Sequence, residues 1–102
     1  MCEDEDLNTF EDNVANMFVS LEELLLSKHA DYGPTNISQA PGGALNGLVV
    51  RLWDKMARIR NLHSAFNEDQ VKPNYESLED TFKDMANYAI IALLVMEGKW
   101  PT

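Results

Sequence analysis

Hydrophobic residues recur at helical spacing in three long segments of this chain, and none of these segments alternates with the two-residue period of a strand. The spacing predicts three principal helices, over about residues 9–29, 44–66 and 76–97. The connector between the first two is rich in glycine, proline, asparagine and serine, which favours at most a short helical turn there. The predicted fold class is therefore all-α.

Residues near the ends of these segments are typical of helix termini. Thr9, followed three residues later by Asp12, resembles a capping box, and Gly98 is a natural C-cap. Ser77 with Asp80 resembles a second capping box, which predicts that the third helix starts near Ser77 or slightly earlier.

The last part of the third helix, residues 88–96, is apolar on almost every side. Such a helix has to be covered all round, by its own domain or by a partner subunit. We therefore expect a helical bundle that is completed by oligomerisation, as a homo-oligomer. Trp53 and Trp100 are expected in the core or at an interface.

Composition and charge narrow the classes of partner. The chain has 102 residues, of which residues 9–102 are expected to form a single domain after an acidic flexible tail over residues 1–8. Its net charge of −9 argues against binding duplex nucleic acid, which needs a basic surface. No apolar run has the length of a membrane span, and the single cysteine, Cys2, agrees with a reducing compartment. A cytoplasmic protein without a membrane partner is expected.

Two charged rows carry the candidate chemistry. On the third helix, three acids four residues apart share one stripe with an amide at its end: Glu76, Asp80, Asp84 and Asn87. On the second helix, a charged stripe opposite the apolar one consists of Arg51, Asp54, Lys55 and Arg58. Like charges four residues apart repel each other, so the acidic row needs a nearby cation, supplied either by basic side chains or by a metal ion.

The rows have a structural interpretation and a functional one. In the first, Asp54 pairs with Arg58, and the bases of the second helix pair with the acids of the third. In the second, Arg51, Lys55 and Arg58 bind phosphate, and Asp54 orients a base or contributes to metal binding. The acids of the third helix hold Mg²⁺, which prefers oxygen ligands. The candidate metal ligands are Glu76, Asp80 and Asp84, with Glu22 and Glu23 of the first helix.

Three motifs follow one another along the chain: Lys28 with DYG at 31–33, GLVVRLWDKMARI at 47–59, and ESLEDTFKDMANYAI at 76–90. In this order they resemble the nucleotide modification-associated domain family, small proteins common in bacteriophages, over roughly residues 10–96. The resemblance implies a role in phage nucleotide metabolism. It places these residues at characteristic positions of the family: Lys28, Asp31, Tyr32, Gly33, Arg51, Asp54, Lys55, Arg58, Glu76, Asp80, Asp84, Asn87 and Tyr88. Lys28, Asp31 and Tyr32 are expected at the mouth of any cleft between the first two helices, where Tyr32 would stack on a base.

The third helix is also similar to the Asp-bearing helix of the all-α nucleotide pyrophosphatases, the MazG-like group. That similarity implies magnesium-dependent cleavage of a nucleoside triphosphate, with Glu76, Asp80 and Asp84 as the catalytic acids. Two features depart from that group. Leu26 stands where the motif Glu-Glu-x-x-Glu has its third acid, and Asp80 and Asp84 are four residues apart rather than three.

Three functions stay open at this point. The leading one is Mg²⁺-dependent hydrolysis of a nucleotide phosphoanhydride, which would make the chain a nucleoside triphosphate pyrophosphohydrolase. The second is a protein that sequesters a nucleotide, such as an immune second messenger of the host, without reaction. The third is a structural or interaction bundle without a ligand. The expected location is the host cell cytoplasm if a phage encodes the protein.

Overall fold

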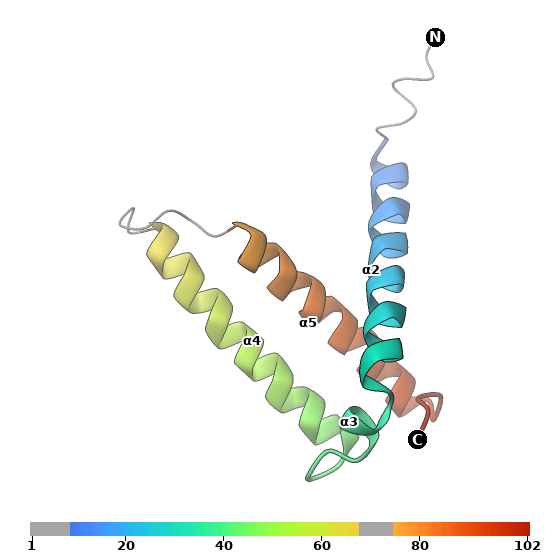
Figure 1. The fold of residues 1–102 in the computed structure, drawn as a ribbon. Helices are drawn as coiled ribbons and strands as arrows, with labels where there is room; N and C mark the ends of the chain where they lie inside the picture. Colours follow the sequence, from blue (N-terminus) through green and yellow to red (C-terminus); the bar gives the residue numbers. More distant parts are fainter. Residues whose placement is uncertain (1–8, 68–74) are drawn as a thin grey trace. The chain divides into compact units, whose positions relative to one another are not determined.

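The computed structural model describes residues 9–67 and 75–102, without the side chains of residues 65–67 and 75–76. This part of the chain contains no strand and forms the helices α2 (Phe10–Tyr32), α3 (Thr35–Ser38), α4 (Ala44–Asn67) and α5 (Tyr75–Met96) (Figure 1). None of them combines the length and the apolar character that crossing a membrane requires. The acidic tail predicted over residues 1–8, with Cys2, lies outside the described residues.

The predicted all-α class and the three principal helices are confirmed, since α2, α4 and α5 match the three predicted segments. The largest difference is at the end of α2, which continues past residue 29 to Tyr32. The helix ends where Gly33 adopts a positive φ of 72° and donates its backbone N–H to the carbonyl of His29 at 2.8 Å. The short helix α3 is the helical turn that was allowed for in the connector.

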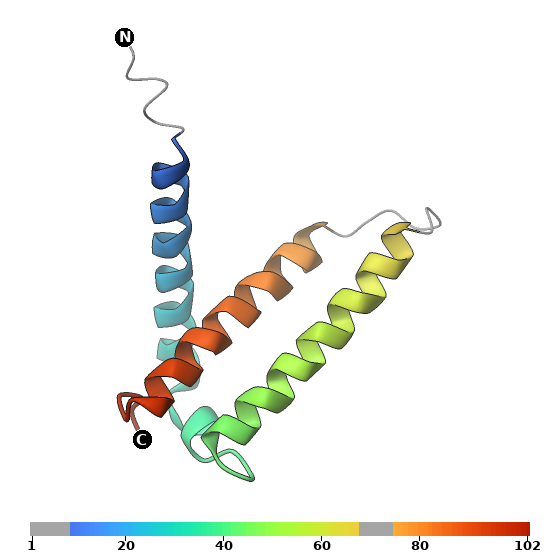
Figure 2. The same ribbon diagram turned by 180° about the vertical axis from the view of Figure 1, so that it is seen from behind.

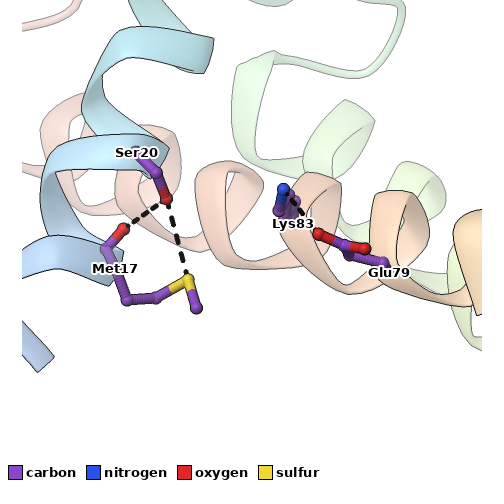
Figure 3. A network of polar contacts seen from close by, with 4 residues as sticks. All are labelled: Met17, Ser20, Glu79 and Lys83. Atoms are coloured by element: carbon purple, nitrogen blue, oxygen red, sulfur yellow. Dashed lines mark hydrogen bonds and ion pairs between the residues drawn. The ribbon is translucent and has the colours of Figure 1, made fainter. Parts of the chain in front are cut away.

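Two compact units make up the chain, Met1–Gly33 and Pro34–Thr102. The first contains α2, which begins as predicted: Thr9 Oγ1 accepts a hydrogen bond from the backbone N–H of Asp12 at 3.1 Å. Within α2, Ser20 Oγ donates to the carbonyl of Met17, one turn earlier, at 2.8 Å (Figure 3).

The second unit is built on α4 and α5, which lie side by side and run antiparallel in both views (Figures 1 and 2). Among its described residues, the buried apolar side chains are Ile37, Leu48 and Ile91, of which Leu48 is fully buried. Thr81 is buried as well, and its Oγ1 donates to the carbonyl of Ser77 at 2.7 Å. Because α5 starts at Tyr75, Ser77 lies inside its first turn and does not cap it.

The end of α5 follows the Schellman pattern, as the prediction of Gly98 as C-cap implies. Gly98 has a φ of 71° and donates to the carbonyl of Val95 at 3.0 Å, while Lys99 donates to that of Leu94 at 2.8 Å. The chain then turns back, and Trp100 Nε1 donates to the carbonyl of Pro34 at 3.1 Å. The last residues are thereby tied to the beginning of the same unit.

Within its own unit, the apolar segment at residues 88–96 is covered on one side only. Ile91 is buried, whereas Leu93 and Met96 are 59% and 69% exposed. Cover on every side, as the sequence predicts, would therefore require a further surface.

Gly47 offers a direct test of the packing between α4 and the connector. A Cβ atom at Gly47 would lie 2.6 Å from the Cβ of Ala40, which is too close for two methyl groups. Alanine usually stabilises a helix interior by about 1 kcal/mol over glycine. Overpacking costs roughly 1–3 kcal/mol, so we expect Gly47→Ala to lower the free energy of unfolding in urea.

The matched control exchanges the two residues. In Gly47→Ala combined with Ala40→Gly, the second methyl group is gone, so stability should return to or exceed that of the wild type. A single Gly47→Ala variant that is more stable than the wild type would contradict this account.

Candidate functional site

Two contacts between α4 and α5 bring the two predicted charged rows together. Lys55 Nζ lies 3.3 Å from Asp84 Oδ2. The guanidinium of Arg51 lies over the ring of Tyr88, with Cζ 5.9 Å from its centroid. The step of four residues from Arg51 to Lys55 on α4 thus corresponds to the step from Tyr88 back to Asp84 on α5, because the two helices run antiparallel. We call this line of facing residues the α4–α5 seam.

Arg51 is held from a third direction as well. Its Nη2 donates to the main-chain carbonyl of Asn36 in α3 at 3.3 Å. The side chain is half-buried, and it joins α3, α4 and α5 at one point. A guanidinium held in this way loses little further conformational freedom when it binds another group.

Arg58 and Asp54 behave differently, since both are exposed. The ion pair between them that the structural interpretation predicted does not form in the described part of the chain. Continuing the register of the seam by one turn brings Arg58 level with Asp80 and Thr81. Asp80 is exposed too, so this end of the seam carries one cation and one acid in contact with solvent.

The amide at the end of the acidic row is in the interior. Asn87 is only 6% exposed, which leaves little of its amide accessible to a ligand. Its place one turn beyond Asp84 continues the acidic row into the packed part of the unit.

One of the predicted magnesium ligands lies outside the side chains that the structure describes, and two others belong to α2. The side chain of Glu76 is not described, and Glu22 and Glu23 are exposed residues of α2, in the other unit. Among the described residues, no three His, Cys, Asp or Glu side chains converge in the way that a metal site needs. A bound Mg²⁺ therefore stays a prediction.

Lys28, Asp31 and Tyr32 lie in the last turns of α2 and are exposed. They belong to the first unit, whereas the α4–α5 seam belongs to the second. Their part in a common site stays a prediction.

Two residues at the seam were not among the candidate ligands. Tyr88 occupies a family position and follows Asp84 by one turn, and this spacing could have drawn attention to its ring. Asn36 acts through its main-chain carbonyl, for which a side-chain pattern gives no signal.

The lysine of α5, Lys83, is engaged within its own helix. Lys83 Nζ lies 2.9 Å from Glu79 Oε2, one turn earlier (Figure 3). The hydrogen bond with Glu79 and the charge of its carboxylate raise the pKa of Lys83 above its ordinary value.

A shallow hollow on another side of α4 is lined by Ala57, Arg60, Asn61 and Ser64. It contains no residue of the seam.

Comparison with known families places these residues in context. A family model described as Nucleotide modification associated domain 1 matches residues 28–96, which is more than half of the chain. The chain belongs to this family. Its matched region includes both contacts of the α4–α5 seam and every predicted site residue except Glu22 and Glu23. Comparison with curated proteins and with solved structures gave no match.

The ion pair of the seam can be measured by a double-mutant cycle in this family member. The side chains of Lys55 and Asp84 are 27% and 17% exposed, between a surface pair and a buried one. We expect Lys55→Met and Asp84→Asn each to lower the free energy of unfolding, with a coupling energy of about 1 kcal/mol.

The pair of Glu79 and Lys83, whose acid is 62% exposed against 17% for Asp84, provides the reference cycle, with Glu79→Gln and Lys83→Met. Its coupling should be smaller, because solvent screens this pair more. Equal coupling in the two cycles would contradict the expected effect of burial, and no coupling between Lys55 and Asp84 would show that their contact does not stabilise the packing of α4 on α5.

Proposed function

We propose that this protein binds a nucleotide through its phosphate groups, along the side of α4 that carries Arg51, Lys55 and Arg58. The observation that supports this best is the alignment of the three cations. They lie in one row whose ends, Arg51 and Arg58, are seven positions apart, about 10 Å along the helix, in a chain whose net charge is −9. A local concentration of positive charge on an acidic protein suits a small anionic ligand better than a polymer.

The three cations would have different roles. Arg58 is exposed and presents a planar fork that suits phosphate oxygens. Lys55 is paired with Asp84 but still partly exposed, so it contributes a point charge beside the fork. Arg51 is oriented by the carbonyl of Asn36, and the ring of Tyr88 next to it offers an apolar surface for a base or a sugar.

Membership in the nucleotide modification associated domain 1 family supports a nucleotide as this ligand. Binding without reaction ranks first, because Asp84 Oδ2 is engaged by Lys55 and Asp80 is the other described acid of the row. In this form the protein would sequester its nucleotide.

Magnesium-dependent hydrolysis of a phosphoanhydride is the second candidate. It is favoured by the position of Asp80 and Asp84, one turn apart on α5 and beside the cations. Their carboxylate oxygens, with those of Glu76, suit Mg²⁺, which when bound would polarise a phosphoryl oxygen. The side chains Arg51, Lys55 and Arg58 would then hold the phosphates in place for attack by water.

A binding measurement with two arginine variants tests the proposal. A thermal-shift panel of nucleoside mono-, di- and triphosphates and cyclic dinucleotides selects the ligand, and calorimetry gives its affinity. We expect Arg58→Gln to weaken binding about tenfold or more, the value of one lost charge-assisted hydrogen bond. Binding should also weaken as salt is added.

Arg60→Gln is the matched control. Arg60 follows Arg58 by two residues, which turns it to nearly the opposite side of α4, and it is exposed as well. Its variant should bind like the wild type. A panel without any shift, or equal losses in the two variants, would overturn the proposal.

The reaction itself separates the two candidates. After incubation with each ligand that binds, with and without Mg²⁺, sequestration predicts that the nucleotide is recovered intact. Hydrolysis predicts pyrophosphate or phosphate release that requires Mg²⁺ and is lost in Asp80→Asn, while Glu79→Gln on the neighbouring position keeps it. Intact recovery under all conditions would exclude the second candidate.

A further inference from the structure

The cations along α4 differ in what balances their charge. Arg51 is held by two neutral groups, the main-chain carbonyl of Asn36 at 3.3 Å and the ring of Tyr88. Lys55 Nζ instead lies 3.3 Å from a carboxylate oxygen of Asp84. The middle cation of the row is therefore the one that already has an anion beside it.

This carboxylate competes with any phosphate group that approaches Lys55. Both anions offer an ammonium group the same contact, a negatively charged oxygen at hydrogen-bonding distance. The ammonium has three donors and can contact both, but the two anions would then lie a few ångström apart and repel each other. In either arrangement Asp84 opposes the binding of phosphate at this position.

The lysine is the partner that is able to move. Its side chain is 27% exposed, whereas that of Asp84 is 17% exposed and is attached by a shorter stem. Lysine carries its charge on four flexible methylene groups. Lys55 can therefore turn from Asp84 toward a phosphate group while the carboxylate keeps its place between the helices.

We propose that Asp84 determines which anions this site accepts, because its carboxylate occupies Lys55 until a phosphate group displaces it. A small anion at Lys55 gains one contact and loses another. A nucleotide also contacts Arg51 and Arg58, on either side of Lys55, and these contacts offset the opening of the ion pair. The site thereby excludes single phosphate ions. This inference rests on the proposed binding of nucleotide phosphates along α4.

A resident competing anion leads to an unusual combination of effects in one variant. Asp84→Asn removes the ion pair with Lys55, so it should lower the free energy of unfolding, as expected above. The same change frees Lys55 for phosphate, so it should strengthen binding. If Asp84 only supported the packing of α4 on α5, its loss would weaken stability and binding together.

Calorimetry of the full chain tests this with inorganic phosphate, inorganic pyrophosphate and the nucleotides of the panel. We expect Asp84→Asn to bind each of them about tenfold more tightly than the wild type, the value of one charged contact. Glu79→Gln is the matched control, because it removes the same charge from another side of α5, five residues earlier. Its variant should bind like the wild type.

Lys55→Met, made both in the wild type and in Asp84→Asn, separates displacement from simple repulsion. If phosphate has to displace the carboxylate, the methionine costs more affinity in the Asp84→Asn background, by about threefold or more. Equal losses in the two backgrounds would show that the ion pair stays closed when phosphate binds, and would overturn the proposal.

The outcomes distinguish this inference from the proposed function. If Asp84→Asn binds no more tightly while Arg58→Gln still weakens binding, the inference fails and nucleotide binding stands. If neither the wild type nor Asp84→Asn binds any of these anions, both fail.

If Asp84→Asn does not fold, the side-chain ¹⁵N signals of the lysines in the wild type decide. The signal of Lys55, assigned by its absence in Lys55→Met, should shift when a nucleotide binds, because the ammonium exchanges one anion for another. The signal of Lys83, which is paired with Glu79, should stay unchanged. An unchanged Lys55 signal in the nucleotide-bound protein would overturn the inference.

Discussion

The antiparallel register between α4 and α5 is the constraint on which the second unit depends. It aligns Lys55 with Asp84 and Arg51 with Tyr88, and one turn nearer the connector it brings the buried side chains of Leu48 and Ile91 to the same level. A slip by one turn would move each partner by about 5 Å. It would separate the ion pair and expose part of the core at once. The polar contacts and the apolar core therefore select the same alignment.

The features that the sequence predicts well are the ones set by neighbouring residues. The three long helices follow from periodicity, and the ends of α2 and α5 follow from Thr9 and Gly98, whose effects act within one turn. Ser77 shows the limit of this reasoning. It has the pattern of a cap, but α5 begins two residues earlier, so its carbonyl instead accepts the hydroxyl of Thr81.

The candidate site was predictable in its residue types but not in its pairing. Periodicity places Arg51, Lys55 and Asp84 on stripes, yet the choice of partner depends on how two helices meet. Hence the contact of Arg51 with the carbonyl of Asn36, 15 residues away, had no signal in the sequence. Asn87 belongs to the same stripe as Asp84, but the stripe turns into the packed interior at that point.

The hydrogen bond from Trp100 to Pro34 joins two residues that are 66 positions apart. Pro34 is the first residue of the second unit, and Trp100 is close to its last. The hydrogen bond therefore links the first residue of the unit to a residue near its end. Helix ends normally fray one residue at a time. Here the segment after α5 and the residue before α3 are held by the same hydrogen bond. Opening either end breaks this hydrogen bond, so fraying at one end of the unit removes a contact that also orders the other end.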